Sequence, residues 1–132
     1  MLVNKAMGIS SDTVMFILPK QTFSGVSIDI SLGDDPFSLE PYGIKGVVYH
    51  TPGHSSGSMS LLLNTGEAFV GDLAVGGLPQ RIKPNKSVFA EEPHKVIEGW
   101  RRLIDLGAEW FYPAHGRPFK VGALENLLRK AA

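Results

Sequence analysis

The sequence predicts an α/β fold in which a mixed, mostly antiparallel β-sheet is flanked by helices. The first observation is a series of short apolar or alternating runs between residues 14 and 71, separated by turn-forming Pro, Gly, Asn and Asp residues. The second is an apolar stripe of helical period at residues 93–106, followed by an apolar run at 108–112 and a second stripe at 121–130. Short turns favour antiparallel pairing of neighbouring strands.

Strands are expected throughout the first half of the chain. The apolar run 14–18 ends at a proline, and residues 25–30 alternate apolar with polar side chains, as in a half-buried strand. Asn64-Thr65-Gly66 is a hairpin signal between two later runs. Residues 1–13 carry little structural signal and are expected to be disordered. The expected strands are residues 14–18, 25–30, 37–40, 44–49, 58–63 and 67–71.

The clearest helix is expected at residues 93–106. Pro93 suits the first turn of a helix, because its missing N–H would have no partner there. Gly107 suits the C-terminal end, where a left-handed backbone is common. One face of this helix is apolar and the opposite face is charged. The apolar face consists of Val96, Ile97, Trp100, Leu103 and Ile104.

Three further elements complete the chain. Residues 87–92 are expected to form about one helical turn. Residues 108–112, with Trp-Phe-Tyr at their centre, indicate a buried strand. After Pro118 the apolar positions 121, 124, 127 and 128 recur with helical spacing, so residues 121–130 are expected to form a terminal helix.

Composition indicates a single domain over residues 1–132. Folding a chain of this size buries roughly two-thirds of its unfolded surface. The formal net charge is zero, which argues against broad binding of nucleic acid or of an anionic membrane. There is no Cys, so disulfides and thiolate ligands are excluded. No apolar run approaches the roughly 18 residues of a membrane span, no signal-peptide pattern is seen, and a cytoplasmic location is expected.

Three short motifs place polar side chains at the ends of expected strands. Residues 51–58 read Thr-Pro-Gly-His-Ser-Ser-Gly-Ser, residues 70–72 read Val-Gly-Asp, and residues 113–116 read Pro-Ala-His-Gly. Polar groups on loops that a rigid sheet positions are how binding and catalytic sites are usually built. A carboxylate at the end of the apolar strand 67–71 is costly unless it is solvated or paired. Such positions suit a binding or catalytic site, although a loop histidine taken alone is more often a structural residue than a ligand.

In this order, the three motifs resemble the second half of the metallo-β-lactamase superfamily, over about residues 25–130. The resemblance implies half of a four-layer αββα sandwich. It also implies a metal role for each motif: His54 would bind one metal, Asp72 would bridge two metals, and His115 would bind the second. Zinc is the expected metal, with iron or manganese as alternatives, because imidazole and carboxylate ligands accept all three.

The leading motif of that family, HxHxDH, is absent from this chain. The four histidines are His50, His54, His94 and His115, and no two of them have the spacing that this motif needs. Each metal would therefore keep one histidine and the shared aspartate, fewer than the three ligands of a typical catalytic zinc site. A single ion held by two histidines and one carboxylate is an alternative that requires rearrangement.

Other polar residues allow a structural and a functional interpretation. His50 is expected to pack or to support the site through a hydrogen bond, and His94, at a helix start, is expected to be exposed. The Asp34 and Asp35 pair is expected to serve a turn rather than a metal. The basic loop after Asp72 is either solvated or positioned to meet an anionic substrate. Its basic residues are Arg81, Lys83 and Lys86.

The function implied by the resemblance is metal-dependent hydrolysis of an ester, thioester, amide or phosphoester by a metal-activated water, and an iron-bound, oxygen-using member is also compatible. Three interpretations stay open: a piece of a complete hydrolase, a stand-alone chain whose missing ligands come from another polypeptide, or a scaffold or binding module with relict metal motifs and an empty site. We expect little activity from the chain alone. We also expect the open sheet face to be covered by a second copy or by a complementing polypeptide, with a small-molecule substrate if the site is active.

Overall fold

The computed structural model describes residues 24–25, 27–77, 83–86 and 89–131. The chain divides into two compact units, residues 1–31 and residues 32–132. The described residues of the first unit contain no helix or strand, so the strand expected at 25–30 is wrong for residues 27–30. The alternating pattern is present, but a strand also needs a hydrogen-bonding neighbour, and none pairs with these residues in the described part of the chain. The predictions for residues 1–13 and 14–18 fall outside the described residues.

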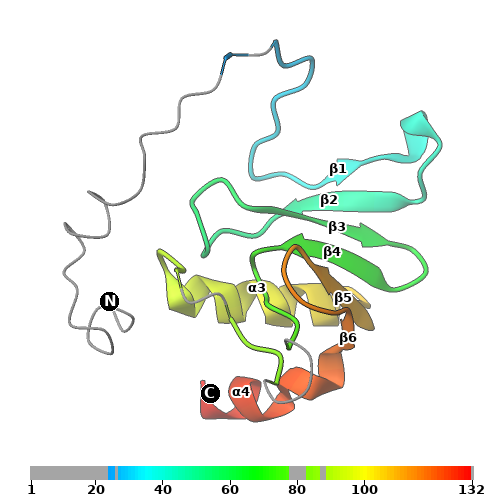
Figure 1. The fold of residues 1–132 in the computed structure, drawn as a ribbon. Coiled ribbons are helices and arrows are strands. Elements are labelled where there is room, and N and C mark those ends of the chain that lie inside the picture. Colours follow the sequence, from blue (N-terminus) through cyan, green and yellow to red (C-terminus); the bar gives the residue numbers. More distant parts are fainter. Residues whose placement is uncertain (1–23, 26, 78–82, 87–88, 132) are drawn as a thin grey trace. The chain divides into compact units, whose positions relative to one another are not determined.

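The second unit is built on a mixed six-stranded sheet with strand order β1-β2-β3-β4-β5-β6 (Figure 1). All neighbouring strands pair antiparallel except β4 and β5, which are parallel. The predicted α/β class with a mostly antiparallel sheet is therefore confirmed. The strands are β1 (Phe37–Ser38), β2 (Gly46–His50), β3 (Met59–Leu63), β4 (Glu67–Gly71), β5 (Trp110–Pro113) and β6 (Phe119–Lys120).

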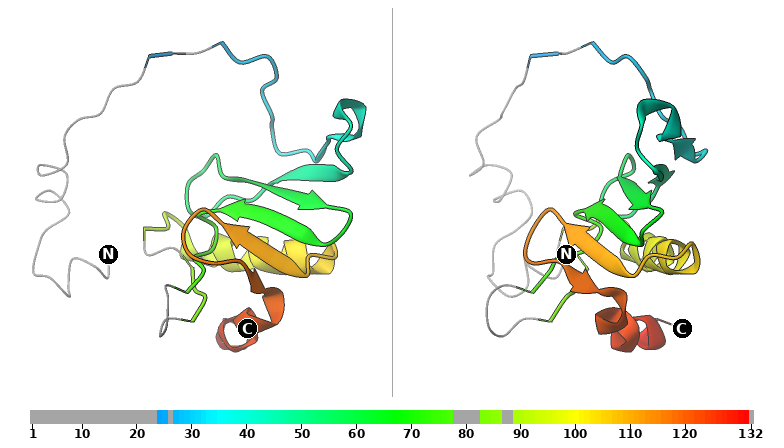
Figure 2. Two further views of the ribbon diagram at one scale, coloured as in Figure 1. Left: turned by 45° about the vertical axis from the view of Figure 1, so that its right-hand side comes forward. Right: turned by 90° about the vertical axis from the view of Figure 1, so that its right-hand side faces the viewer.

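The parallel pair exists because a helix connects its two strands, as crossover connections between parallel strands usually do. Helix α3 (Pro93–Asp105) follows β4 and precedes β5. Figure 2 shows α3 lying along one face of the sheet. The terminal helix begins as a 3₁₀ turn rather than as an α-helix. The remaining elements are the 3₁₀ helices η1 (Glu40–Tyr42) and η2 (Val121–Leu124) and the α-helix α4 (Glu125–Lys130).

The core lies between α3 and the covered face of the sheet. Alternate strand residues point toward the helix, and the helix presents its apolar stripe to them, as the period predicts. Trp100 is fully buried, and its indole Nε1–H donates a hydrogen bond of 2.9 Å to the carbonyl oxygen of Leu73. The fully or nearly fully buried side chains of this core include Leu62, Ala68, Val70, Leu73, Val96, Trp100, Leu103, Phe111 and Leu124.

The opposite face of the sheet carries a continuous row of apolar side chains. Directly paired residues on neighbouring strands share a face, so the strand register places them in one line across β1 to β5. The rings of Phe69 and Tyr112 stack with centroids 5.1 Å apart, and Phe69 is 45% exposed. We call this line the apolar row. It consists of Phe37, Val48, Leu61, Phe69 and Tyr112.

Several local details differ from the sequence prediction. Strand β6 was not predicted, because its two residues are too short for a periodic signal. Residues 89–92 form no helix. The strand expected at 37–40 ends at Ser38, shortly before η1 begins at Glu40.

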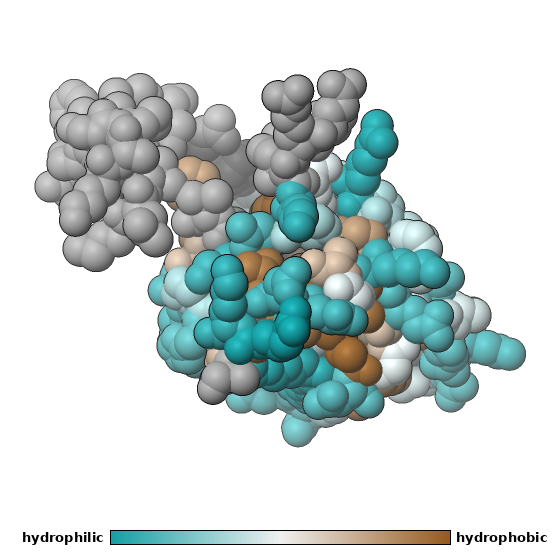
Figure 3. Space-filling model, turned by 90° about the horizontal axis from the view of Figure 1, so that it is seen from below, coloured by the Kyte–Doolittle hydropathy of each residue, from teal (hydrophilic) through white to brown (hydrophobic). Residues whose placement is uncertain are grey.

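No helix within the described ranges is both long and apolar enough to cross a membrane. On the surface seen from below, hydrophilic side chains surround smaller apolar areas (Figure 3).

Candidate functional site

The loop at residues 51–58, between β2 and β3, carries His54 and is fixed against the start of α3. Gly53 has a φ of +143°, and a Cβ there would lie 2.6 Å from the backbone nitrogen of Val96. The N–H of Glu92 donates to the carbonyl oxygen of Gly53 at 2.8 Å. Only glycine combines this φ with so close an approach. The residue before His54 therefore docks the loop on the helix.

Asp72 follows β4 on a turn that the core holds in place. Gly71 has a φ of +54°, and the Leu73 N–H donates to the carbonyl of Val70 at 3.0 Å, which closes the turn. The side chain of Leu73 is buried, and its carbonyl oxygen accepts the indole hydrogen bond of Trp100. The backbone on both sides of Asp72 is thus fixed, while its carboxylate remains 29% exposed.

His115 follows β5 and reaches the same edge of the sheet as Asp72. Parallel neighbouring strands end at the same edge, so the β4–β5 pair brings the two motifs together across 43 residues of sequence. The Ala114 N–H donates to the carbonyl of Gly71 at 2.9 Å and continues the pairing beyond the strands. The side chain of His115 is 72% exposed.

The three predicted side chains converge on the carboxylate of Asp72. His115 Nδ1 lies 2.6 Å from Asp72 Oδ1, a hydrogen bond in which the ring nitrogen donates. His54 Nε2 lies 3.7 Å from Asp72 Oδ2, which is beyond hydrogen-bond distance. His54 Nδ1 is buried and has no hydrogen-bond partner among the described residues. The structure therefore brings together all three residues that the motifs indicated.

The two imidazoles and the carboxylate are the types of ligand that these metals accept, but their positions in the structure do not form a three-ligand group. Two ligands of a tetrahedral zinc ion, each at 2.0–2.1 Å, lie about 3.3 Å apart. The His54–Asp72 separation is compatible with a shared ion, whereas the 2.6 Å contact between Asp72 and His115 is too short for one. Across the described residues, no group of three acidic, His or Cys side chains is arranged to hold a metal ion.

A histidine–aspartate contact and a lysine–glutamate ion pair hold the surroundings of the His54 loop. His50 Nδ1 lies 2.6 Å from Asp34 Oδ1, and His50 Nε2 donates to the carbonyl oxygen of Ser56 at 2.8 Å. His50 thus supports the loop, and Asp34, predicted only as a turn residue, is its partner. At the loop's anchor, the hydrogen bond from the Lys95 ammonium lowers the pKa of Glu92, and the same bond raises the pKa of Lys95.

Of the basic loop, only Lys83 and Lys86 can be placed, because Arg81 falls outside the described residues. Both described lysines are exposed. Asn85, between them, forms an isolated antiparallel bridge with Val75. The basic loop therefore runs beside the segment that follows Asp72, although no contact of either lysine with the three candidate ligands is seen.

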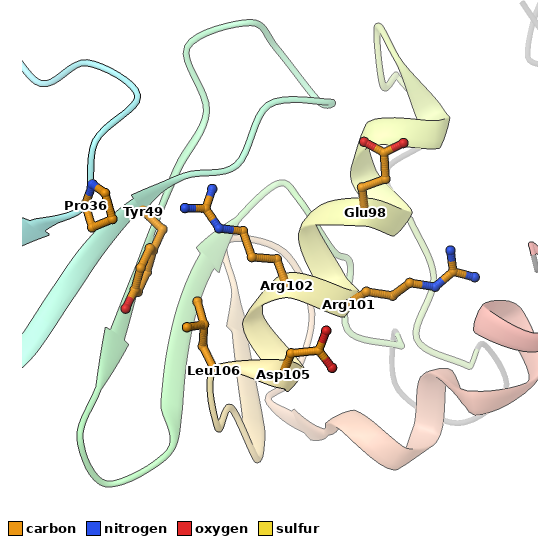
Figure 4. Close-up of a pocket in the computed structure, with 7 residues that line it drawn as sticks. All are labelled: Pro36, Tyr49, Glu98, Arg101, Arg102, Asp105 and Leu106. Carbon is orange, nitrogen blue, oxygen red and sulfur yellow. The ribbon is translucent and has the colours of Figure 1, made fainter.

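A cavity of about 660 Å³ lies away from the three candidate ligands, between β2 and the outer side of α3 (Figure 4). Arg102 lies over the ring of Tyr49, 5.3 Å from its centroid, and Arg102 Nη1 donates to the carbonyl of His50 at 3.2 Å. Two acidic and two basic side chains line it, so it favours no ligand charge. It is lined by Pro36, Tyr49, Glu98, Arg101, Arg102, Asp105 and Leu106.

Comparison with known proteins gives matches among solved structures. No protein-family model and no curated protein sequence matches the chain. An archaeal metallo-β-lactamase superfamily protein from Sulfolobus tokodaii has 26% identity and a TM-score of 0.55, over 74% of this chain and 37% of that protein. A metallo-β-lactamase family protein from Thermus thermophilus has 23% identity and a TM-score of 0.52, over 98% of this chain and 43% of that protein.

A third match covers a larger share of the matched protein. The BLEG-1 B3 metallo-β-lactamase has 17% identity and a TM-score of 0.61, over 96% of this chain and 68% of that protein. At such identities, the latter two likenesses concern the fold. The chain spans less than half of the Sulfolobus and Thermus proteins. Together with the mixed sheet and the motifs at its strand ends, these matches show that the chain carries part of the metallo-β-lactamase superfamily fold.

Proposed function

We propose that this chain supplies the metal-facing residues His54, Asp72 and His115 of a metal-dependent hydrolase site. The single observation that carries this proposal is their convergence: three loops that are far apart in sequence place two imidazoles around one carboxylate. Nδ1 of His54 adds support, since it is buried and pairs with no group among the described residues, whereas most buried polar atoms have a hydrogen-bond partner. The substrate classes are an ester, thioester, amide or phosphoester.

Within this site, the residues have distinct tasks. A bound zinc, iron or manganese ion would activate water and stabilise developing negative charge. Asp72 orients His115 by accepting its Nδ1–H, and the docked loop keeps His54 Nε2 turned toward the same carboxylate. Two protein ligands per ion are fewer than catalytic zinc sites use. We therefore propose little hydrolysis by the chain alone and a complete site only when further ligands are supplied.

The test is Zn²⁺ binding by the chain, measured by calorimetry and by elemental mass spectrometry. We expect the affinity of His54→Ala to fall at least about tenfold, the lower end of what loss of a supporting residue costs a metal site. His94→Ala is the matched control, because this histidine is 67% exposed and lies outside the site. Equal binding by wild type and His54→Ala would contradict the assignment of His54 as a ligand.

The alternative function is a non-catalytic scaffold or binding module. The observation that favours it is the direct Asp72–His115 hydrogen bond, which satisfies both side chains without a metal. In that case the wild-type chain would carry no metal above background and would bind no Zn²⁺ in the calorimeter. The same experiment therefore separates the two functions.

We also propose that a second copy of this chain covers the apolar row. The face is self-complementary in charge, because Trp110 pairs with Glu67 on one side and with Lys120 on the other. A two-fold axis through the face can set Glu67 of each copy against Lys120 of the other, with the aromatic rings of the row between them. Five strands about 4.8 Å apart also offer a broad surface for such pairing.

Light scattering at micromolar concentration tests this partner. We expect a dimer for the wild type and a monomer for Phe69→Lys, because the added charge replaces an exposed aromatic ring of the apolar row. Phe89→Lys is the control, since Phe89 is 72% exposed and does not belong to the row. A wild-type monomer would contradict the proposed pairing of two copies.

A further inference from the structure

We propose that the backbone contact between Gly76 and Gly116 sets the position of His115 relative to Asp72. We call it the glycine contact. This inference rests on the proposed function, because His115 and Asp72 are two of the proposed metal-facing residues. The contact between the two glycines does not depend on that assignment. The sequence motifs include Gly116 but do not indicate that it meets Gly76, because their closeness depends on the β4–β5 pairing, which brings the two segments together.

The two backbones approach more closely here than any side chain permits. A Cβ on Gly76 would lie 1.9 Å from the carbonyl oxygen of Arg117, and a Cβ on Gly116 would lie 1.7 Å from the carbonyl oxygen of Gly76. Distances below 3.0 Å are essentially never seen for a Cβ. The Gly76 N–H donates to the carbonyl oxygen of His115 at 2.9 Å, which closes the contact.

Packing of the His115 side chain cannot supply this positioning. That side chain is 72% exposed, and among the described residues its hydrogen-bond partner is Asp72. Asp72, in contrast, stands on a turn fixed by the buried Leu73 and by the indole of Trp100. The glycine contact ties the His115 carbonyl to the buried Gly76, on the segment that follows this turn. His115 therefore takes its place from the backbone.

The two glycines offer different tests. Gly116 has a φ of +90°, so an alanine there would suffer both from backbone strain and from lack of space. Gly76 has no positive φ, so Gly76→Ala changes the available space alone. Gly57→Ala is the matched control: Gly57 also has no positive φ, lies in the His54 loop, and would place its Cβ in open space.

The experiment is NMR of the metal-free chain, with ¹⁵N-labelled histidine, at mildly alkaline pH. The pattern of long-range ¹H–¹⁵N couplings reports which ring nitrogen of His115 carries the proton. We expect the Nδ1–H form in the wild type and in Gly57→Ala, because Asp72 accepts from Nδ1. In Gly76→Ala we expect this preference to be lost. A mere loss of stability would leave the preference unchanged in the molecules that remain folded.

A second measurement protects the test against a variant that fails to fold. Hydrogen exchange of the wild-type Gly76 amide should be slowed by its bond to the His115 carbonyl, and free exchange would overturn the proposal. If folded Gly76→Ala keeps the Nδ1–H form of His115, the proposal is overturned as well. If the ring changes but the wild type binds no Zn²⁺, the glycine contact stands and the proposed function fails. If the wild type binds Zn²⁺, and Gly76→Ala binds it with equal affinity and keeps the Nδ1–H form of His115, the proposed function stands and the proposal for the glycine contact fails.

Discussion

Trp100→Ala is expected to lower the free energy of unfolding by about 3–5 kcal/mol. The indole is fully buried at the centre of the core, so its removal leaves a large cavity between α3 and the sheet. The change also removes the hydrogen bond to the Leu73 carbonyl and leaves that buried oxygen unpaired. Domains of this size have only about 5–15 kcal/mol of stability in total. Urea denaturation followed by circular dichroism measures the loss.

Trp110→Ala provides the matched control for this prediction. Trp110 is of the same residue type, but it is 37% exposed on the opposite face of the sheet, where Lys120 Nζ lies 5.6 Å from its ring centroid. Its removal creates no enclosed cavity, so we expect a loss of less than half that of Trp100→Ala. Equal losses for the two variants would mean that Trp100 does not lie at the centre of the core.

Gly53→Ala is expected to destabilise the protein by about 2–4 kcal/mol, through backbone strain and overpacking combined. At a φ of +143° a side chain is strained, and the new methyl group would also meet the backbone of Val96. The loop must then lift from the start of α3, which carries His54 away from Asp72. We therefore expect Zn²⁺ affinity to fall together with stability.

Gly57→Ala, in the same loop, separates these effects from the ordinary cost of a Gly-to-Ala change. At a compatible backbone position this substitution leaves stability unchanged or raises it by up to about 1 kcal/mol. Urea titration of both variants gives the two values directly. A Gly53→Ala variant as stable as Gly57→Ala would show that the loop is not docked on the helix.

Local sequence signals predicted the parts of the fold that local chemistry decides. The hairpin at Asn64-Thr65-Gly66 and the helix from Pro93 to Asp105 formed because turn residues, caps and apolar period agree. The alternating residues 27–30 formed no strand, because pairing depends on a neighbour that periodicity does not reveal. The two-residue β6 was missed because its pairing with Trp110 and Phe111 is a property of the sheet.

The candidate site divides in the same way. His54, Asp72 and His115 could be named from three motifs, and the structure brings them together. Their arrangement could not be predicted, because the direct Asp72–His115 hydrogen bond depends on backbone positions set by the β4–β5 pair. The partnership of His50 with Asp34, and the close approach of Gly76 to Gly116, likewise arise from chain crossings that no local pattern records.

The parallel pairing of β4 with β5 also has a kinetic side. Leu62 meets Ala68 across a short hairpin, whereas Asp72 and His115 lie 43 positions apart in sequence, with the whole of α3 between them. Closing the longer loop costs about 2 kcal/mol more chain entropy, at roughly 0.6 kcal/mol for each doubling of length. The hairpins from β1 to β4 can therefore form early and independently. The constellation around Asp72 is completed only when the helix has docked and the distant strand has been added.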